Sequence, residues 1–208
     1  METTTTAIRV WDAPTRVFHW LLVLSFAGAY LTSESERWSL VHITLGYTLG
    51  GLLAFRFFWG FVGTRYARFT SFVKGPSEVL QYAKSMATLK PKHFVGHNPL
   101  GAVAIVLLIA SGIAIVVTCY AAFNEIGGEW VAELHEVASH IMLILVGIHI
   151  VGVIAASWLH KENLARAMVN GFKQGKAADG ISRVWVSVAV VLVAAVWGFW
   201  YLQWAPLG

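Results

Sequence analysis

Long apolar stretches separated by shorter polar segments dominate the chain. Five of them approach the roughly 20 residues that an α-helix needs to cross a lipid bilayer. They cover Val17–Leu31, Leu40–Trp59, Leu100–Tyr120, Val137–Leu159 and Val184–Trp204. None of them alternates apolar and polar residues throughout, and each is too long for a barrel strand, so the pattern predicts transmembrane helices.

The composition favours a membrane protein and argues against several soluble classes. Of the 208 residues, 57% are hydrophobic and 12% are charged, and the mean hydropathy is +0.65. So few charges cannot cover a soluble globule, which argues against a soluble enzyme, a disordered protein and a nucleic-acid binder. Cys119 is the single cysteine. A disulfide framework, a Cys-ligated iron–sulfur cluster and covalently attached haem, which requires C-x-x-C-H, are therefore excluded.

The distribution of Lys and Arg predicts the orientation. Of the 15 in the chain, 14 fall in the N-terminal segment, at the inner end of the second span or after it, or between the fourth and fifth spans, and only Arg37 falls elsewhere. Cytoplasmic loops retain such residues, so we expect a cytoplasmic N-terminus and a periplasmic C-terminus in the bacterial inner membrane. The two outer connections are short and acidic. The predicted parts are a cytoplasmic segment over 1–16, a core over 17–159 with a cytoplasmic loop over 60–99, a second cytoplasmic loop over 160–183, and the fifth span with the C-terminus over 184–208.

An amphipathic stretch around Ser77–Met86 lies within the longer cytoplasmic loop. Its apolar residues recur at helical spacing among polar ones. The stretch fits a helix that lies along the membrane surface and fits a solvated helical loop equally well.

Four histidines fall at matched depths in the predicted spans. His135 and His149 are 14 residues apart in the fourth span, so they share nearly one helix face and are separated by a rise of about 21 Å. His135 lies near the outer surface and His149 lies towards the inner leaflet. His42 opens the second span at the outer edge, and His19 lies near the inner end of the first. The depths pair His42 with His135 and His19 with His149.

Two imidazoles that face each other between apolar helices suit haem, because its iron takes axial nitrogen ligands on opposite faces of the porphyrin. Zinc would require more N, S or O ligands, and no carboxylate or thiol cluster accompanies these pairs in the sequence. A proton relay would require acidic residues inside the spans, where Glu136 at an interface is the one candidate. The spacing therefore favours two bis-histidine b-type haems that transfer electrons, since both axial positions of each iron are filled.

Other histidines provide alternatives to this ligand set. His140 is rotated by about 140° from the outer ligand on its own helix, which predicts a packed or hydrogen-bonded residue. His160 shares the face of His149 but lies too far towards the cytoplasm to match the depth of His19. His97, just before the third span, is the rival partner for His19.

Two arginines lie where haem propionates need counter-charges. Arg16 precedes His19 by one helical turn, and Arg56 follows His42 by 14 residues on the same face at the depth of the inner haem. Both are candidates for bidentate contacts with propionates. The alternative is that they are snorkelling residues that only mark the inner interface.

Several motifs around these residues occur together and in order. They are VWDAPTRVFHW at the first span, VHITLGY and RFFWGFVGTRYARF along and after the second, GHNPLG before the third, ELHEVASHIMLILVGIHIVGV in the fourth and MVNGFKQG after it. Over roughly Val10–Lys173 the chain resembles the bacterial cytochrome b561 superfamily and the related b-type cytochrome subunits of nickel–iron hydrogenases.

The resemblance implies an all-α integral membrane protein, with a four-helix transmembrane bundle that holds two haem b groups on these four histidines. It also implies electron exchange with the quinone pool alongside a redox partner in the periplasm, such as a c-type cytochrome or a dehydrogenase. Alternatives are a stand-alone superoxide:quinone oxidoreductase, a membrane anchor subunit of a nickel–iron hydrogenase, and a non-redox channel or transporter whose histidines bind metal. Whether the chain is itself an enzyme stays open.

Two features depart from the family pattern. A fifth, C-terminal span lies beyond the bundle, which suggests an additional surface for lipid or for a homo- or hetero-oligomeric contact. The stretch between His42 and His135 looks shorter than in hydrogenase subunits, which argues against the hydrogenase assignment.

Overall fold

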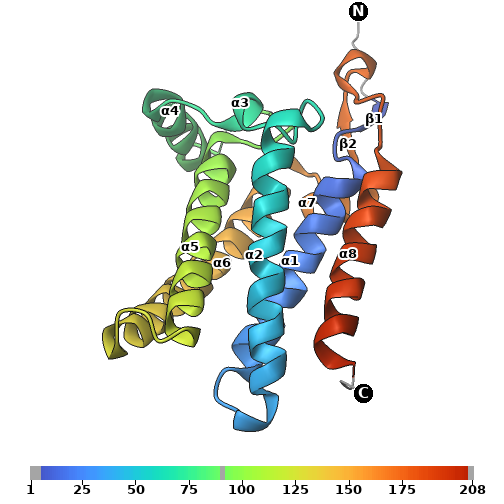
Figure 1. Ribbon diagram of the computed structural model, residues 1–208. Helices are drawn as coiled ribbons and strands as arrows, with labels where there is room; N and C mark the ends of the chain where they lie inside the picture. The colour runs from blue at the N-terminus through green and yellow to red at the C-terminus, as the bar shows by residue number, and fades with distance from the viewer. Residues whose placement is uncertain (1–5, 90–91, 206–208) are drawn as a thin grey trace, which may run out of the picture. The chain divides into compact units, whose positions relative to one another are not determined.

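The computed structural model of the chain describes residues 6–89 and 92–205 (Figure 1). Lys90, one of the cationic residues behind the predicted orientation, lies outside the described residues. The elements in chain order are β1 (Thr6–Arg9), α1 (Ala13–Thr32), the 3₁₀ turn η1 (Glu36–Trp38), α2 (Ser39–Val62), α3 (Phe69–Phe72), α4 (Pro76–Ala87), α5 (Pro99–Phe123), α6 (Glu129–His160), α7 (Leu164–Asn170), β2 (Phe172–Gly175), the 3₁₀ turn η2 (Ala177–Asp179) and α8 (Val186–Trp204).

Each predicted apolar stretch lies on one long helix, namely α1, α2, α5, α6 and α8, so the helical membrane fold is confirmed. Among the described residues, four helices are long and apolar enough to cross a membrane, over Glu36–Val62, Pro99–Phe123, Glu129–His160 and Val186–Trp204. The 20 residues of α1 match a span in length. They are less apolar, because Arg16 and His19 lie in the first turns of the helix. Its crossing of the bilayer therefore stays a prediction.

The chain divides into two compact units, each of which gathers residues from distant parts of the sequence. The first contains the segment that ends at Asp12, Phe58–Ile109 and Leu143–Val184. The second contains Ala13–Phe57, Ala110–Met142 and the chain from Trp185 onward. They are described separately below.

In the second unit, α8 packs along α1, and the two helices lie side by side in Figure 1. Phe18, Leu52 and Val196 form a buried apolar cluster that joins α1, α2 and α8. The indole Nε1 of Trp200 donates to the Thr48 hydroxyl at 2.8 Å, which satisfies a polar group where lipid offers no hydrogen-bond partner. The fifth predicted helix is therefore packed against the others of this unit.

Small residues bring α2 close to α5 in the same unit. A Cβ added to Gly50 would meet Val116 at 3.0 Å, and one added to Gly46 would meet the Cys119 sulfur at 3.6 Å. Small residues spaced by four are a common means of close helix approach in membranes, where packing replaces the hydrophobic effect as the driving force. In contrast, Val190, Val191 and Trp197 on α8 are more than half exposed, as expected of side chains that face lipid.

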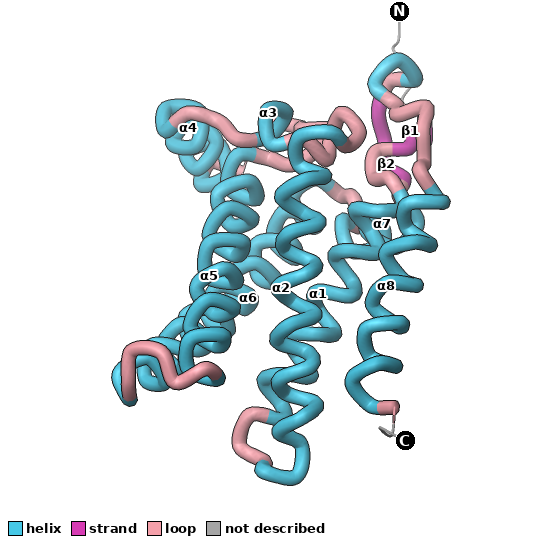
Figure 2. Tube along the Cα trace, viewed as in Figure 1, coloured by secondary structure: helices cyan, strands magenta, loops and turns pink. Residues whose placement is uncertain are grey.

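In the first unit, β1 and β2 form a two-stranded antiparallel sheet with Thr6 opposite Gly175 and Arg9 opposite Phe172 (Figure 2). Helix α7 ends just before Gly171, whose φ is 87°. The Gly171 oxygen accepts hydrogen bonds from the main-chain nitrogens of Val10 and Trp11. The sequence did not predict this sheet, because each strand has only four residues and no visible alternation. The sheet is a small addition to the predicted all-α membrane fold.

The remaining elements of the first unit surround a small core of Ile8, Val10, Trp11, Tyr66 and Ala167. The amphipathic stretch around 77–86 is helical and forms α4. The start of α5 is capped within the GHNPLG motif, where Asn98 Oδ1 accepts from the Gly101 nitrogen at 2.7 Å.

Candidate functional site

The second unit brings together the two histidines predicted for the outer site. His42 lies in the first turn of α2 and His135 lies in the second turn of α6. Their ring centres are 6.3 Å apart and their planes cross at 81°. Two imidazoles on opposite sides of one metal ion, each with a metal–nitrogen bond of about 2 Å, have ring centres about 6 Å apart. The observed separation fits that arrangement.

Main-chain oxygens fix the proton on each of these rings. His42 donates from Nδ1 to the Ala29 oxygen at 2.8 Å, and His135 Nδ1 lies 3.2 Å from the Ile115 oxygen. A carbonyl oxygen can only accept, so in both rings Nδ1 carries the hydrogen. The lone pair then lies on Nε2, the atom that a metal-ligating histidine presents when its other nitrogen is held by the protein.

Thr118 on α5 adds a third partner that the sequence did not identify. Its Oγ1 donates to the Ala114 oxygen at 2.8 Å and lies 3.2 Å from His135 Nδ1, which places it to accept from the ring. A hydroxyl on so apolar a helix is the signal that could have found it, although the same pattern also arises from hydroxyls that bond only to their own helix.

The histidines predicted for the inner site fall in different units. His19 on α1 belongs to the second unit and His149 on α6 to the first. Both are half-buried, and the His19 ring packs against Trp20 with ring centres 5.1 Å apart. The pairing of His19 with His149 stays a prediction from spacing.

The two candidate arginines differ in burial. Arg56 lies towards the end of α2 and is 3% exposed, whereas Arg16 in the first turn of α1 is half-buried. A guanidinium is rarely buried to this degree without an anionic partner. Arg56 is thus more buried than a snorkelling residue, whose head group reaches water, and its pairing with a haem propionate stays a prediction.

The remaining histidines of the fourth span and its surroundings have other contacts. His140 is exposed, and its Nδ1 lies 3.0 Å from the Glu136 oxygen one turn earlier on the same helix. In the first unit, the His97 ring packs against Trp11 and Phe72, with ring centres 4.5 and 4.7 Å apart. His97 remains the alternative predicted partner for His19.

Asp12 is a buried charged residue that the sequence analysis did not single out. It is fully buried in the first unit, where its Oδ2 accepts from the Thr64 hydroxyl at 2.6 Å and from the Trp59 indole at 3.2 Å. Its position inside the VWDAPTRVFHW motif is the signal that could have identified it.

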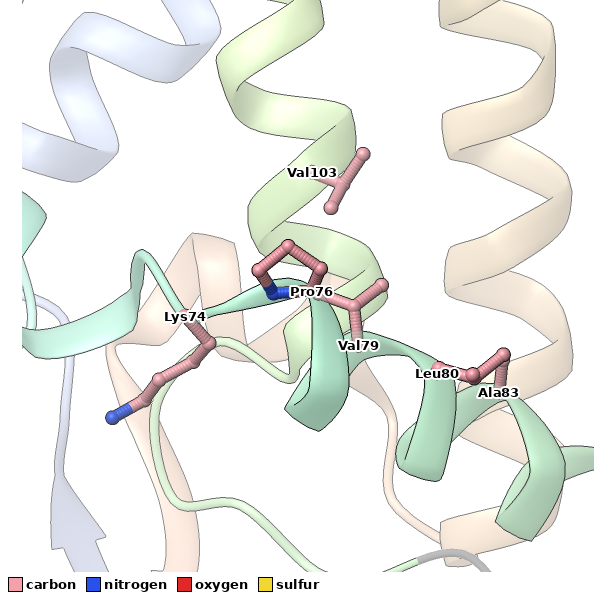
Figure 3. A pocket seen from close by; sticks show the side chains of 6 residues that line it. All are labelled: Lys74, Pro76, Val79, Leu80, Ala83 and Val103. Atoms are coloured by element: carbon pink, nitrogen blue, oxygen red, sulfur yellow. The ribbon is translucent and has the colours of Figure 1, made fainter.

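Within the described ranges, no group of three or more His, Cys, Asp or Glu side chains is placed to hold a metal ion. Outside the histidine sites, side chains of α4 and Val103 of α5 line a shallow apolar groove in the first unit (Figure 3). Lys74 lies at its edge and extends away from the apolar side chains (Figure 3).

Comparison with known proteins identifies the family of the chain. The family model for prokaryotic cytochrome b561 matches residues 10–171. A "Probable Ni/Fe-hydrogenase B-type cytochrome subunit" of Azotobacter vinelandii is 27% identical, over 82% of this chain and 90% of the relative. A protein of the same name from Rhizobium leguminosarum is 24% identical, over 79% and 88%, and the "Probable Ni/Fe-hydrogenase 1 B-type cytochrome subunit" of Escherichia coli is 27% identical, over 56% and 60%. No solved structure matches the chain. The chain belongs to the prokaryotic cytochrome b561 family and is a multi-pass membrane b-type cytochrome that serves in electron transfer.

Proposed function

We propose that this cytochrome carries electrons across the inner membrane, between the quinone pool and a redox protein in the periplasm, through two haem b groups. Each group is a one-electron iron couple without an open coordination position when two histidines fill its axial sites. The protein's part is to hold, orient and shield these groups.

The observation that carries the proposal is the geometry of His42 and His135. Their ring centres are 6.3 Å apart, and both Nδ1 atoms are held by main-chain oxygens. With Nδ1 held in each ring, Nε2 is the nitrogen with which His42 and His135 would hold the haem iron. These two residues are the proposed ligands of the outer haem.

His19 and His149 are the proposed ligands of the inner haem. With a helical rise of about 21 Å between His135 and His149, two haems held there would lie near opposite membrane surfaces. Arg56, 3% exposed, and Arg16 are proposed to pair with haem propionates, because a guanidinium forms bidentate contacts with carboxylates. Burial in the protein would make such a pair insensitive to salt.

The periplasmic partner is proposed from charge. Both predicted outer connections lie in the second unit, where Glu34, Glu36, Glu125 and Glu129 are exposed. An acidic surface near the outer haem would favour a basic c-type cytochrome or redox subunit and would raise its association rate at low ionic strength. The half-exposed face of α8 offers a separate surface to lipid or to another subunit.

A second candidate function is that of a membrane anchor for a nickel–iron hydrogenase. The observation in its favour is that relatives matching up to 82% of this chain are named as Ni/Fe-hydrogenase B-type cytochrome subunits. In this role the same outer haem would receive electrons from the hydrogenase. The two candidates differ only in the partner, so copurification from native membranes distinguishes them.

The test of the proposal is a haem count on the purified wild-type chain and on its histidine variants. The wild type should contain two haems per chain and give a reduced-minus-oxidised spectrum of b-type haem. Changing His19, His42, His135 or His149 to Ala should remove or perturb one haem each, whereas His140→Ala should keep both. A single haem in the wild type, or loss of haem in His140→Ala, would overturn the ligand assignment.

A further inference from the structure

Five titratable side chains from five segments of the first unit meet at the end of α6. They come from α4 (Tyr82), from the loop before α5 (His93), from the last residue of α6 (His160), from the turn that follows it (Glu162) and from β2 (Lys173). None of them belongs to the proposed haem sites. We refer to them as the inner polar cluster.

A buried ion pair forms the base of the inner polar cluster. Lys173 Nζ lies 3.2 Å from Glu162 Oε2, and the two side chains are 4% and 12% exposed. Lys173 Nζ also donates to the Phe94 oxygen at 3.1 Å, and Glu162 Oε1 accepts from the Gln174 nitrogen at 2.9 Å. These bonds hold both charged side chains in place, and the other three groups of the cluster lie beside them.

The other three groups form a line from water to a buried hydroxyl. The His93 side chain is 49% exposed, and its Nε2 lies 4.0 Å from Glu162 Oε2. The His93 ring packs edge-on against the His160 ring, with ring centres 5.8 Å apart. His160 Nε2 lies 3.2 Å from the hydroxyl of Tyr82, a residue that is 2% exposed.

We propose that Tyr82 and His160, reloaded from the cytoplasm through His93 and Glu162, form a relay that delivers protons to a quinone reduced at the inner end of this cytochrome. The proposal rests on the proposed quinone reactivity and adds to it the groups that move the protons.

The chemistry requires such a path. A quinone becomes a quinol when it takes up two electrons, supplied one at a time by the cytochrome, and two protons, one on each oxygen. In each proton step the Tyr82 hydroxyl gives its proton to the quinone oxygen and receives another from His160 Nε2. His160 is then reprotonated from water by way of His93, with the Glu162 carboxylate stabilising the passing positive charge. No proton is created or lost along the line.

Burial supports the role of the tyrosine. Desolvation raises the pKa of the Tyr82 hydroxyl above its ordinary value of 10.0. The group therefore stays protonated at neutral pH and remains a donor. An exposed carboxylate in its place would be ionised and could not give a proton.

We place the entry of a lipid-soluble quinone at the apolar groove on α4. It is lined by Val79, Leu80 and Ala83 of α4 together with Val103, which lies within the apolar stretch of α5 (Figure 3). Tyr82 lies on the same helix but outside the lining of the groove, so the quinone head has to pass beyond the groove to reach its hydroxyl. Pockets for such ligands are mostly apolar, with a few polar groups that fix the head.

Two conservative variants test the relay, each with a matched control. Tyr82→Phe removes only the hydroxyl, and Tyr120→Phe removes an exposed one at the far end of α5. His160→Gln removes the imidazole, and His140→Gln does the same at an exposed position of the same helix. The assay is reduction of decylubiquinone by the purified dihaem protein between pH 6 and 8, in H₂O and in D₂O.

We expect Tyr82→Phe and His160→Gln to lower kcat by about tenfold or more, with KM within twofold of wild type. They should flatten the pH profile and raise the solvent isotope effect, while the controls match wild type. A readout independent of turnover is the imidazole titration of His160 followed by NMR, which Tyr82→Phe should shift and Tyr120→Phe should not.

The outcomes separate the relay from the function it serves. A wild-type protein with two haems that fails to reduce decylubiquinone overturns the quinone reactivity and the relay together. A wild-type protein that does reduce it, while Tyr82→Phe and His160→Gln keep its kcat and pH profile, overturns the relay alone. If Tyr82→Phe loses haem, the NMR titration of the His160 imidazole replaces the turnover assay. A titration of His160 that is unchanged in this variant also counts against the relay.

Discussion

The Nδ1 atom of His42 lies 2.8 Å from the main-chain oxygen of Ala29, at the opposite end of the short connection between α1 and α2. This bond sets the tautomer of the imidazole and orients its ring. The oxygen belongs to the last turn of α1. The orientation of His42 thus depends on a main-chain oxygen of the neighbouring helix, and no side-chain substitution can remove that hydrogen-bond acceptor directly.

For His135 part of the same support comes from a side chain, and this difference can be tested. Thr118→Val removes the hydroxyl 3.2 Å from His135 Nδ1 but leaves the Ile115 oxygen as a partner. Because such second partners hold the ring and raise its basicity, we expect the affinity for the outer haem to fall by about tenfold. The measurement is the rate of haem transfer to apomyoglobin, together with a potentiometric titration that should show one of two midpoints shifted.

Thr44→Val is the matched control for that substitution, because the Thr44 hydroxyl donates to the Leu40 oxygen of its own helix at 2.7 Å. It should leave both haems and both midpoints as in wild type. Equal haem loss in the two variants would mean that Thr118 acts through packing and not through His135.

Trp200→Phe should loosen α8 by removing the 2.8 Å hydrogen bond from its indole to Thr48. Hydrogen bonds between membrane helices contribute about 1 kcal/mol, so we expect a loss of that size in the free energy of unfolding. Unfolding in mixed SDS micelles measures it, with Trp197→Phe at a 63% exposed position of the same helix as control. An equal loss in both variants would contradict a specific role for the Trp200 bond.

Two glycines of α2 should respond in opposite directions to the same change. A Cβ at Gly60 would overlap the Phe69 ring, whereas a Cβ at Gly51 would meet no atom within 4 Å. Gly60→Ala should therefore destabilise the protein by about 1–3 kcal/mol, while Gly51→Ala should stabilise it by about 0.5–1 kcal/mol, because alanine loses less backbone freedom on folding. Thermal unfolding of the detergent-solubilised protein distinguishes the signs.

Glu162→Gln should destabilise the first unit in a manner that depends on pH. Burial lowers the pKa of Lys173 below its ordinary 10.5, while the Glu162 carboxylate raises it back in part. The unfolded state thus binds more protons between the folded pKa and 10.5, so stability rises with pH in that window. Loss of the carboxylate lowers the folded pKa further and widens the window towards neutral pH.

We therefore expect Glu162→Gln to cost about 3 kcal/mol at pH 7 and to recover part of this loss at pH 10. Unfolding free energies at the two pH values provide the measurement, and Glu78→Gln, at an exposed position of α4, is the control. A variant with the same deficit at both pH values would show that Lys173 does not carry the effect.

The long helices were predictable because apolar stretches of membrane length have one stable outcome in lipid. The pairing of His42 with His135 was predictable for a related reason, since regular helices convert sequence spacing into depth and facing. The partners of these rings were not predictable. Thr118 and the Ala29 oxygen act through tertiary contacts between helices, and nothing in the local pattern distinguishes a hydroxyl or carbonyl that meets an imidazole from one that does not.

The β1–β2 sheet escaped prediction for a different reason. Strands as short as TAIR and FKQG contain too few residues to set up a period of two, and their stability comes from pairing across most of the chain. The inner polar cluster is similar, because Tyr82, His93, His160 and Lys173 carry no common motif and meet only through the fold.

The pairing of β1 with β2 also sets an order on biosynthesis. Thr6–Arg9 leave the ribosome before α1–α7, and their partners in Phe172–Gly175 appear only after those helices have been translated. Until then the main-chain amides of β1 have no strand to bind. A nascent or prematurely terminated chain that lacks β2 would therefore carry an open strand edge, the feature by which quality-control proteases and chaperones distinguish unfinished products from finished ones.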